Sequence, residues 1–190
     1  EMLSISKPVQ LVDYNALPDA FLDFMVFSKD IKKPDVTVYR LKESIETAME
    51  LDAKGVDFHT NHTPMLKSDF YINGWAEKNT DFWNRICDEY KGIEIYLENM
   101  FDDTPDMLKT LSDNLSGKEN FAVCLDYAHA TVFGKNADSF VKELSPYVKH
   151  IHINDNDLED DLHLAVGDGK INWENFKIHF LENLGNAKSI

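Results

Sequence analysis

Short apolar runs alternate along the chain with longer stretches in which apolar residues recur every three or four positions. The first longer stretch predicts a helix over about residues 36–53, with Leu41, Ile45 and Met49 on one stripe and a glycine after it. The run GVDFHTNH (55–62) is short and predicts a strand that continues into a loop. The change of periodicity therefore marks a helix followed by a strand.

The same pattern continues to the end of the chain. Further strands are predicted over 92–99, 121–126 and 147–154, and further helices from Thr80 to a stop at Gly92 and over 104–116, 137–144 and 172–184. The helix over 104–116 begins with Thr104 as N-cap and Pro105 at its first position. Strands that alternate with helices over short connections are typical of a parallel sheet with crossover helices, so the sequence predicts an α/β fold.

The composition is that of a globular domain. The chain has 190 residues, of which 43% are hydrophobic and 28% charged, so one domain over residues 1–190 is expected. No apolar run has the length of a membrane span and no signal-peptide pattern is present, which favours a cytoplasmic protein without an anchor. Cys87 and Cys124 lack the spacing of a disulfide framework or a zinc ribbon, and both are expected to be buried thiols.

The charge is strongly acidic, with 34 Asp and Glu residues against 19 Lys and Arg and a net charge of −15. Only Arg40 and Arg85 are arginines. A protein that grips duplex DNA usually needs a basic face against the phosphates, so this composition argues against nucleic acid as the partner. It suits a site that gathers carboxylates around a cation.

Four polar residues end the apolar strand runs, namely His59, Glu98, Asp126 and His152. Each is separated from the next by 39, 28 and 26 positions, close to the roughly 30 residues of one strand–helix unit. Parallel strands of a barrel end at one face, where the four side chains are expected to converge. One acid at a strand end would most often be a helix cap. Two carboxylates with two imidazoles are the ligand set of a divalent cation such as zinc or manganese, with cobalt as a further candidate.

A second group of polar residues follows these strand ends. His129 and Asp155 each come three residues after a strand-end residue, where the chain turns off the sheet. Asp161 and His163 form a D-x-H pair, and residues i and i+2 of an extended segment share a face, so this pair could hold one cation. The other acids of the loop 155–161 are expected to be solvated.

Three further histidines have weaker cases. His150 lies on the same strand face as the strand-end histidine but one step deeper, so a core histidine is the favoured interpretation. His179 lies within the final helix with no other candidate ligand near it in sequence. His62 is a minor candidate because it stands beside His59.

The strings FHTNH, YLENMF, CLDYAHA, HIHINDND and DLHLAVGDGKINW occur in this order. They resemble the xylose-isomerase-like TIM-barrel superfamily, which includes sugar isomerases and epimerases and the endonuclease IV family. The resemblance covers about residues 36–190. It implies an α/β fold of the TIM (β/α)8 barrel type, with the active site at the carboxyl ends of the strands.

Carried over residue by residue, the resemblance implies that Glu98, Asp126 and His152 bind the shared divalent metal ion. In the epimerase-like members a further glutamate, at the end of the eighth strand, completes this set. Asp126 and His129 also match a D-x-x-H element, whose histidine contacts either the substrate or a further metal ion.

For the endonuclease-like members, the resemblance implies that His59, Asp161 and His163 ligate additional zinc ions. This chain departs from that pattern because no histidine precedes His59, whereas the endonuclease pattern has one at the end of an earlier strand. The stretch LPDAFLDFMVFSKD (17–30) occupies that neighbourhood.

The chain also departs from the pattern of a complete barrel. AKSI (187–190) would begin the eighth strand, so the glutamate of that strand is absent. At 190 residues the chain is shorter than the roughly 250 that are typical of the whole fold. The expectation is a TIM barrel that is incomplete at both ends.

The leading hypothesis is a metal-dependent isomerase or epimerase of a small sugar or sugar phosphate. The cation would polarise a carbonyl and its neighbouring hydroxyl and stabilise an enediolate while a carboxylate moves a proton. Glu98 is the expected proton-transfer residue, and His129 and Asp155 are expected to contact the substrate. Trp75 would cover the apolar face of the sugar, whereas Trp83 falls on a helical stripe and is expected in the core.

Two alternatives remain open from the sequence. One is a zinc phosphodiesterase of the endonuclease IV type, supported by His59, His129, Asp161 and His163 and opposed by the acidic charge. The other is a barrel that binds a metal ion or a sugar without turning it over. A homodimer is also expected, since barrels of this size often pair.

Overall fold

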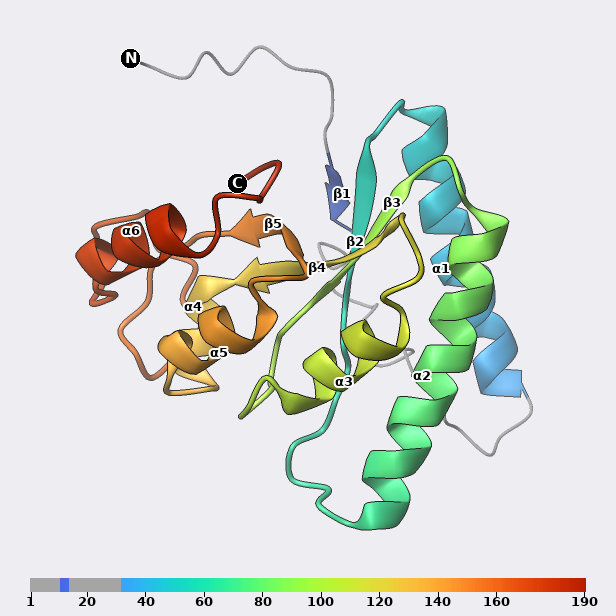
Figure 1. Cartoon of the computed structure of the whole chain (residues 1–190), viewed down its shortest axis with the longest axis horizontal. Helices are drawn as coiled ribbons and strands as arrows, with labels where there is room; N and C mark the ends of the chain where they lie inside the picture. Colours follow the sequence, from blue (N-terminus) through green and yellow to red (C-terminus); the bar gives the residue numbers. More distant parts are fainter. Residues whose placement is uncertain (1–10, 14–31) are drawn as a thin grey trace.

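The computed structural model describes residues 11–13 and 32–190, with side chains from residue 37 onward. Five strands of the described residues form one parallel sheet in the order of the chain. They are β1 (Leu11–Asp13), β2 (Gly55–His59), β3 (Glu94–Glu98), β4 (Phe121–Asp126) and β5 (Val148–His152). Figure 1 shows the sheet curving, with helices along one side of it. Consecutive parallel strands covered by helices on a single face are the arrangement of a TIM barrel.

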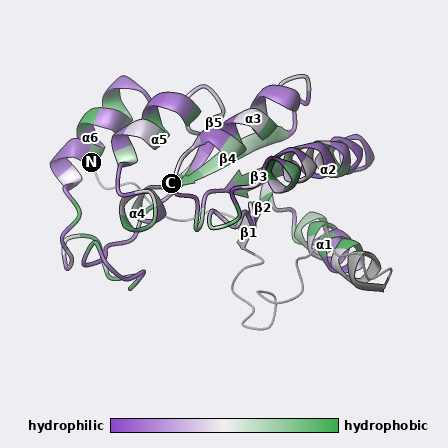
Figure 2. Cartoon of the chain, turned by 90° about the horizontal axis from the view of Figure 1, so that it is seen from below, coloured by the Kyte–Doolittle hydropathy of each residue, from purple (hydrophilic) through white to green (hydrophobic). Residues whose placement is uncertain are grey.

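The helices follow the strands in alternation. They are α1 (Lys32–Glu50), α2 (Asp69–Glu89), α3 (Asp106–Asn114), α4 (Tyr127–Val132), α5 (Ala137–Leu144) and α6 (Trp173–Glu182). In Figure 2, α2 and α3 lie beside the strands and carry hydrophilic residues on their outer turns. None of the helices in the described ranges is long and apolar enough to span a membrane.

Alternation along each strand divides the two faces of the sheet. On β3, Ile95 and Leu97 belong to the main hydrophobic core beneath the helices, whereas Tyr96 belongs to a separate small cluster with Ala122 and Cys124 of β4. Successive side chains of a strand point to opposite faces, so the second cluster lies on the concave interior of the barrel. The interior also carries the polar strand residues. The exterior face of the sheet therefore packs in the main hydrophobic core, and the interior face carries the polar side chains.

The predicted strands are confirmed, and 121–126 and the helix 137–144 have the bounds that the sequence indicates. The predicted start of α2 at Thr80 is wrong. The helix begins eleven residues earlier, where the Ser68 side chain accepts a hydrogen bond from the Tyr71 backbone N–H and caps it. The intervening stretch contains Asn73 and Gly74, which are weak helix formers, and burial of Trp75 against the core overrides that preference.

Two other features differ from the sequence expectations. The short helix α4, which directly follows Asp126, was not predicted, because the chain enters it without any connecting loop. Helix α3 begins at Asp106 with Pro105 as its N-cap, one residue later than expected.

The stretch 17–30 lies outside the described residues. The segment 187–190 does run parallel to β5, since the Ile151 N–H donates to the Ser189 carbonyl at 3.2 Å.

Both cysteines are buried and form no disulfide bond, as expected.

The loop after β5 is built around the buried carboxylate of Asp155. This carboxylate accepts hydrogen bonds from the Gly167 and Ile171 backbone N–H groups and from the Trp173 indole, at 2.9, 3.1 and 2.7 Å. A Cβ at Gly169 would lie only 2.3 Å from an Asp155 carboxylate oxygen, so the loop requires glycine there. Although burial alone would raise the pKa of Asp155, these donors hold it well below its usual value. The ionised carboxylate thus organises the loop.

We predict that Leu125→Ala lowers the free energy of unfolding by about 2–5 kcal/mol, because Leu125 is fully buried in the core between β4 and the helices. Leu181→Ala on α6 is the matched control, since Leu181 is 71% exposed, and it should change stability by less than about 0.5 kcal/mol. Urea unfolding followed by circular dichroism measures both. Equal effects of the two substitutions would contradict the assignment of the core.

We predict that Asp155→Asn destabilises the protein by about 2 kcal/mol at pH 7, the scale of hydrogen bonds to a charged group. The folded pKa of Asp155 is depressed. Its stabilising effect is therefore complete above the unfolded pKa of about 4 and is lost as the pH falls toward the folded pKa. The difference between wild type and variant should shrink in acid. Asp160→Asn, at an exposed position of the same loop, is the control and should have little effect at any pH.

Candidate metal centre

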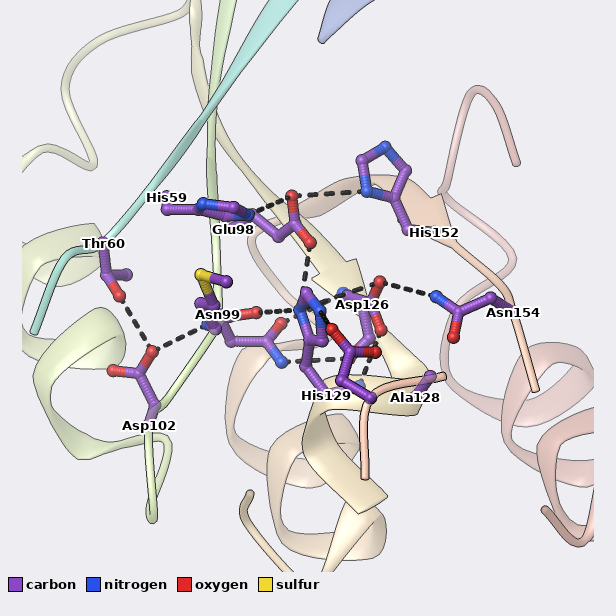
Figure 3. A network of polar contacts seen from close by, with 12 residues as sticks. His59, Thr60, Glu98, Asn99, Asp102, Asp126, Ala128, His129, His152 and Asn154 are labelled. Atoms are coloured by element: carbon purple, nitrogen blue, oxygen red, sulfur yellow. Dashed lines mark hydrogen bonds and ion pairs between the residues drawn. The ribbon is translucent and has the colours of Figure 1, made fainter. Parts of the chain in front are cut away.

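The carboxylate of Glu98, at the end of β3, lies at the centre of a group of three imidazoles. Glu98 is 2% exposed. One of its oxygens, Oε2, lies 3.5 Å from His59 Nε2 and 3.3 Å from His152 Nδ1, and the other, Oε1, lies 3.1 Å from His129 Nδ1 (Figure 3). These histidines come from β2, β5 and α4, so residues far apart in the sequence meet at one carboxylate.

The register of the strands explains this convergence. His59 is directly opposite Glu98 across β2 and β3, and Asp126 is directly opposite His152 across β4 and β5. Between β3 and β4 the register steps, because Glu98 is opposite Cys124. Such a stagger is inherent in strands that tilt around a barrel axis. On the interior face, the Glu98 side chain therefore lies near side chains from β2 on one side of its strand and from α4 and β5 on the other.

Asp126 and His129 are positioned by the start of α4. Asp126 is the N-cap of this helix, and its Oδ1 accepts a hydrogen bond from the His129 backbone N–H at 2.7 Å. The side chain of Asn99 holds the Asp126 backbone through two hydrogen bonds, one to its carbonyl and one from its N–H, at 2.9 and 3.0 Å. Asn154 donates to Asp126 Oδ2 at 3.3 Å. Each carboxylate oxygen of Asp126 therefore accepts a hydrogen bond, and these two bonds fix the orientation of the carboxylate.

Asp161 and His163 approach the same site from the loop after β5. Asp161 Oδ2 lies 3.3 Å from His129 Nε2 and 3.2 Å from His163 Nε2. His163 has a φ of 49°, in the left-handed region that few residues other than glycine adopt. The D-x-H pair thus faces the outer nitrogen of His129, while the inner nitrogen faces Glu98.

The electrostatics of the site balance buried carboxylates against imidazole. Although burial alone would lower the pKa of His129, hydrogen bonds with Asp161 and Glu98 raise it to about 11. Burial would likewise raise the pKa of Glu98, but hydrogen bonds with Asp57, His129 and His152 hold it well below its usual value. Burial raises the pKa of Asp126 to about 6, against the opposing effect of His129.

The donor atoms fit a divalent cation. Glu98, Asp126 and His129 each offer one donor atom, and these atoms lie within 4.8 Å of one another. Asp161, His163 and His129 form a second set with the same spacing. Carboxylate and imidazole donors of this kind suit zinc, manganese and cobalt. The buried carboxylates of Glu98 and Asp126 have oxygen atoms within 4.8 Å of one another, and so the site favours a positive charge.

The structure thus brings together all seven of the predicted ligands, which are His59, Glu98, Asp126, His129, His152, Asp161 and His163. It does not bring the other two candidates to them. Asp155 is fully buried with its carboxylate turned into its own loop. Trp75 is 1% exposed and packs in the core, in edge contact with His62.

Two of the three remaining histidines, and Trp83, lie away from this group. His62 is buried with its Nδ1 3.5 Å from Asp102 Oδ1, and His179 pairs with Asp138 on the surface at 2.9 Å. Trp83 packs against Phe58 in the core, as its helical spacing indicates.

Sequence reasoning missed the polar residues that support the ligands. Asn99 directly follows Glu98, and Asn154 comes two residues after His152. Asparagine is common where a strand runs into a turn, so its presence there does not indicate a supporting role. Asp57 had a stronger signal, because it precedes His59 by two residues on an apolar strand and therefore shares its face. It is fully buried, and one of its carboxylate oxygens lies within 4.8 Å of a Glu98 oxygen.

Comparison with proteins of known sequence gives a curated relative. The uncharacterized protein MJ1311 of Methanocaldococcus jannaschii is 32% identical over 175 residues, which cover 86% of this chain. The chain spans 57% of the length of that relative.

Two solved structures share the fold. A D-tagatose 3-epimerase-like protein has a TM-score of 0.67 and 29% identity, with 86% of this chain and 66% of that chain covered. The TTHB071 protein from Thermus thermophilus, soaked with ZnCl2, has a TM-score of 0.68 and 25% identity, with 84% and 64% covered.

The family described as xylose isomerase-like TIM barrel matches residues 18–185, nearly the whole chain. The match begins further toward the N-terminus than the resemblance in the sequence motifs, and it agrees with the parallel sheet and the strand-end site. This chain belongs to the xylose isomerase-like TIM barrel family.

Proposed function

We propose that this chain carries most of the active site of a divalent-metal-dependent isomerase or epimerase of a sugar or sugar phosphate. The observation that carries the proposal is the buried Glu98 carboxylate, which contacts His59, His129 and His152 at the carboxyl ends of the strands. The likeness to a D-tagatose 3-epimerase-like protein supports this reaction class. The chain spans less than two thirds of its relatives, so the proposal concerns the whole protein to which this site belongs.

Glu98, Asp126 and His152 would hold the ion. When bound, a divalent cation supplies polarisation of a substrate carbonyl oxygen. Glu98 would carry the proton, because its buried carboxylate stands at the site and its Oε1 lies 3.1 Å from His129 Nδ1. His129 would donate a hydrogen bond to a substrate hydroxyl from the ring nitrogen that now faces Asp161.

A groove beside the site offers room for the substrate in place of the buried Trp75. It has a volume of about 430 Å³ and is lined by loop residues that follow β2, β3 and β4, including Phe101, Phe133, Lys67 and Lys135. The Phe133 ring lies 5.8 Å from that of His129, so the groove adjoins the candidate ligands. Aromatic side chains suit the apolar face of a sugar, and the two lysines suit a phosphate group.

A second candidate is metal-dependent phosphodiester hydrolysis. The specific observation that favours it is the additional donor set of His129, Asp161 and His163, which a single-ion isomerase does not need. Hydrolases of phosphodiesters commonly use two metal ions, one on each side of the reacting phosphate. The acidic charge of the chain is unfavourable for a polyanionic substrate.

We predict that Glu98→Gln and His152→Ala each weaken zinc or manganese binding by more than about 100-fold while leaving the circular dichroism spectrum unchanged, because they remove ligands and not core volume. Elemental analysis after dialysis measures the bound metal. Glu89→Gln, a change in a surface ion pair with Lys42, is the control and should retain it. Full metal content in both ligand variants would sink the proposed centre.

In the full-length protein, Glu98→Gln should also lower kcat by about 10²–10⁴-fold, the range of a lost general acid–base group. The assay is incorporation of solvent deuterium into a panel of ketoses and their phosphates. A wild-type protein that binds metal but exchanges deuterium into no sugar would contradict the isomerase proposal.

We predict that His163→Ala leaves the tightly bound metal unchanged, because the isomerase site needs only Glu98, Asp126 and His152. Metal content of purified wild type and variant, measured side by side, tests this. Loss of one zinc ion per chain in the variant would instead favour hydrolysis, and an abasic-DNA cleavage assay would then decide.

A further inference from the structure

A second set of donor side chains lies one step deeper in the barrel than the proposed metal ligands. Asp57, Cys124 and His150 precede His59, Asp126 and His152 by two residues on their strands, and therefore share the interior face with them. Cys124 and His150 are directly opposite one another across β4 and β5. A thiol, an imidazole and a carboxyl group thus meet beneath the strand-end site.

The spacing of these donors matches a small coordination sphere. One donor atom each of Cys124, His150 and His152 lie within 4.8 Å of one another, and so do those of Cys124, His152, Asp57 and Glu98. Bonds of about 2.0–2.3 Å in a tetrahedral zinc site place ligand atoms roughly 3.5 Å apart. Closing onto an ion would therefore require shifts of about 1 Å. Cys124 and His152 are common to both groups.

All three inner side chains are buried. Cys124 and Asp57 are 0% exposed and His150 is 6% exposed. Within the described part of the chain, His150 Nε2 is buried and makes no hydrogen bond, while His150 Nδ1 lies 2.7 Å from the Ser189 hydroxyl. A buried polar atom without a partner is costly, and one ring nitrogen held by a hydrogen bond while the other is available is the usual state of a metal-binding histidine.

The carboxylates add a second requirement for positive charge. Asp57 and Glu98 are both buried, and one oxygen atom of each lies within 4.8 Å of the other and of the Cys124 and His152 donor atoms. A cation between two neighbouring buried carboxylates would compensate for their loss of solvation.

We propose that Cys124 and His152, with His150 or Asp57 as the third ligand, form an inner cation site for a thiophilic divalent ion such as zinc, cobalt or cadmium. Sulfur makes its preference differ from that of the outer carboxylate-rich set, which suits manganese as well. The proposal does not rest on sugar chemistry, because the inner set requires neither Asp126 nor His129.

Cobalt titration of the metal-free protein tests the inner site, because a cobalt–thiolate bond gives an intense near-ultraviolet charge-transfer band that oxygen and nitrogen ligands do not. The band should appear in wild type and disappear in Cys124→Ser. It should persist in Cys87→Ser, the matched control, since Cys87 is the other cysteine and is buried in α2 beneath the sheet. His150→Gln should shift the titration midpoint to higher cobalt if His150 is the third ligand, and Asp57→Asn should do so if Asp57 is.

Further arms separate this proposal from the proposed function. Asp126→Asn should keep the band while it loses sugar turnover, and added zinc should bleach the band in wild type. If wild type binds cobalt with a visible spectrum but shows no charge-transfer band, the ion occupies only the outer set and the inner site is refuted, whatever the activity. A band that survives Cys124→Ser and vanishes in Cys87→Ser would refute it equally. The wild-type spectrum decides the matter even if Cys124→Ser fails to fold.

Discussion

The negative charge of Glu98 has to be compensated within the barrel, because a carboxylate that is almost entirely removed from water loses its solvation. The surrounding strands meet this requirement from three directions, with imidazoles of His59, His129 and His152 at 3.1–3.5 Å. His129 in turn draws Asp161 toward the site, and Asp161 draws His163. Asp161 and His163, on the loop after β5, therefore lie beside the site through a series of polar contacts that starts at one buried carboxylate.

The same carboxylate joins two layers of the interior. The step in register between β3 and β4 places Glu98 opposite Cys124, while Asp126 and His152 pair with each other beyond it. Glu98 consequently contacts Asp57 below and the three histidines around it. The stagger of the strands sets the shape of a barrel, and here it also determines which donor side chains lie next to Glu98.

Most strands and four of the seven candidate ligands, namely His59, Glu98, Asp126 and His152, could be predicted from strand periodicity and from a polar residue at the end of an apolar run, because these are local features. The missed half of α2 and the misplacement of Trp75 have one cause. Burial of Trp75 against the sheet stabilises a helical turn whose own residues favour it poorly, and that burial depends on the rest of the fold. Likewise, no local pattern shows that the Asp155 carboxylate organises the loop that carries Asp161 and His163, since three of its donors lie 12 to 18 residues away.

The sequence by itself determined the fold class, the family resemblance and the set of imidazoles and carboxylates at the strand ends. The tertiary structure decided which of these share a carboxylate, which nitrogen of His129 faces Glu98 and which faces Asp161, and that Cys124 and His150 lie directly opposite one another beneath the candidate ligands. The physical reason is that the alternation of side chains can be read from the sequence of each strand, whereas the register between strands depends on packing across the whole sheet.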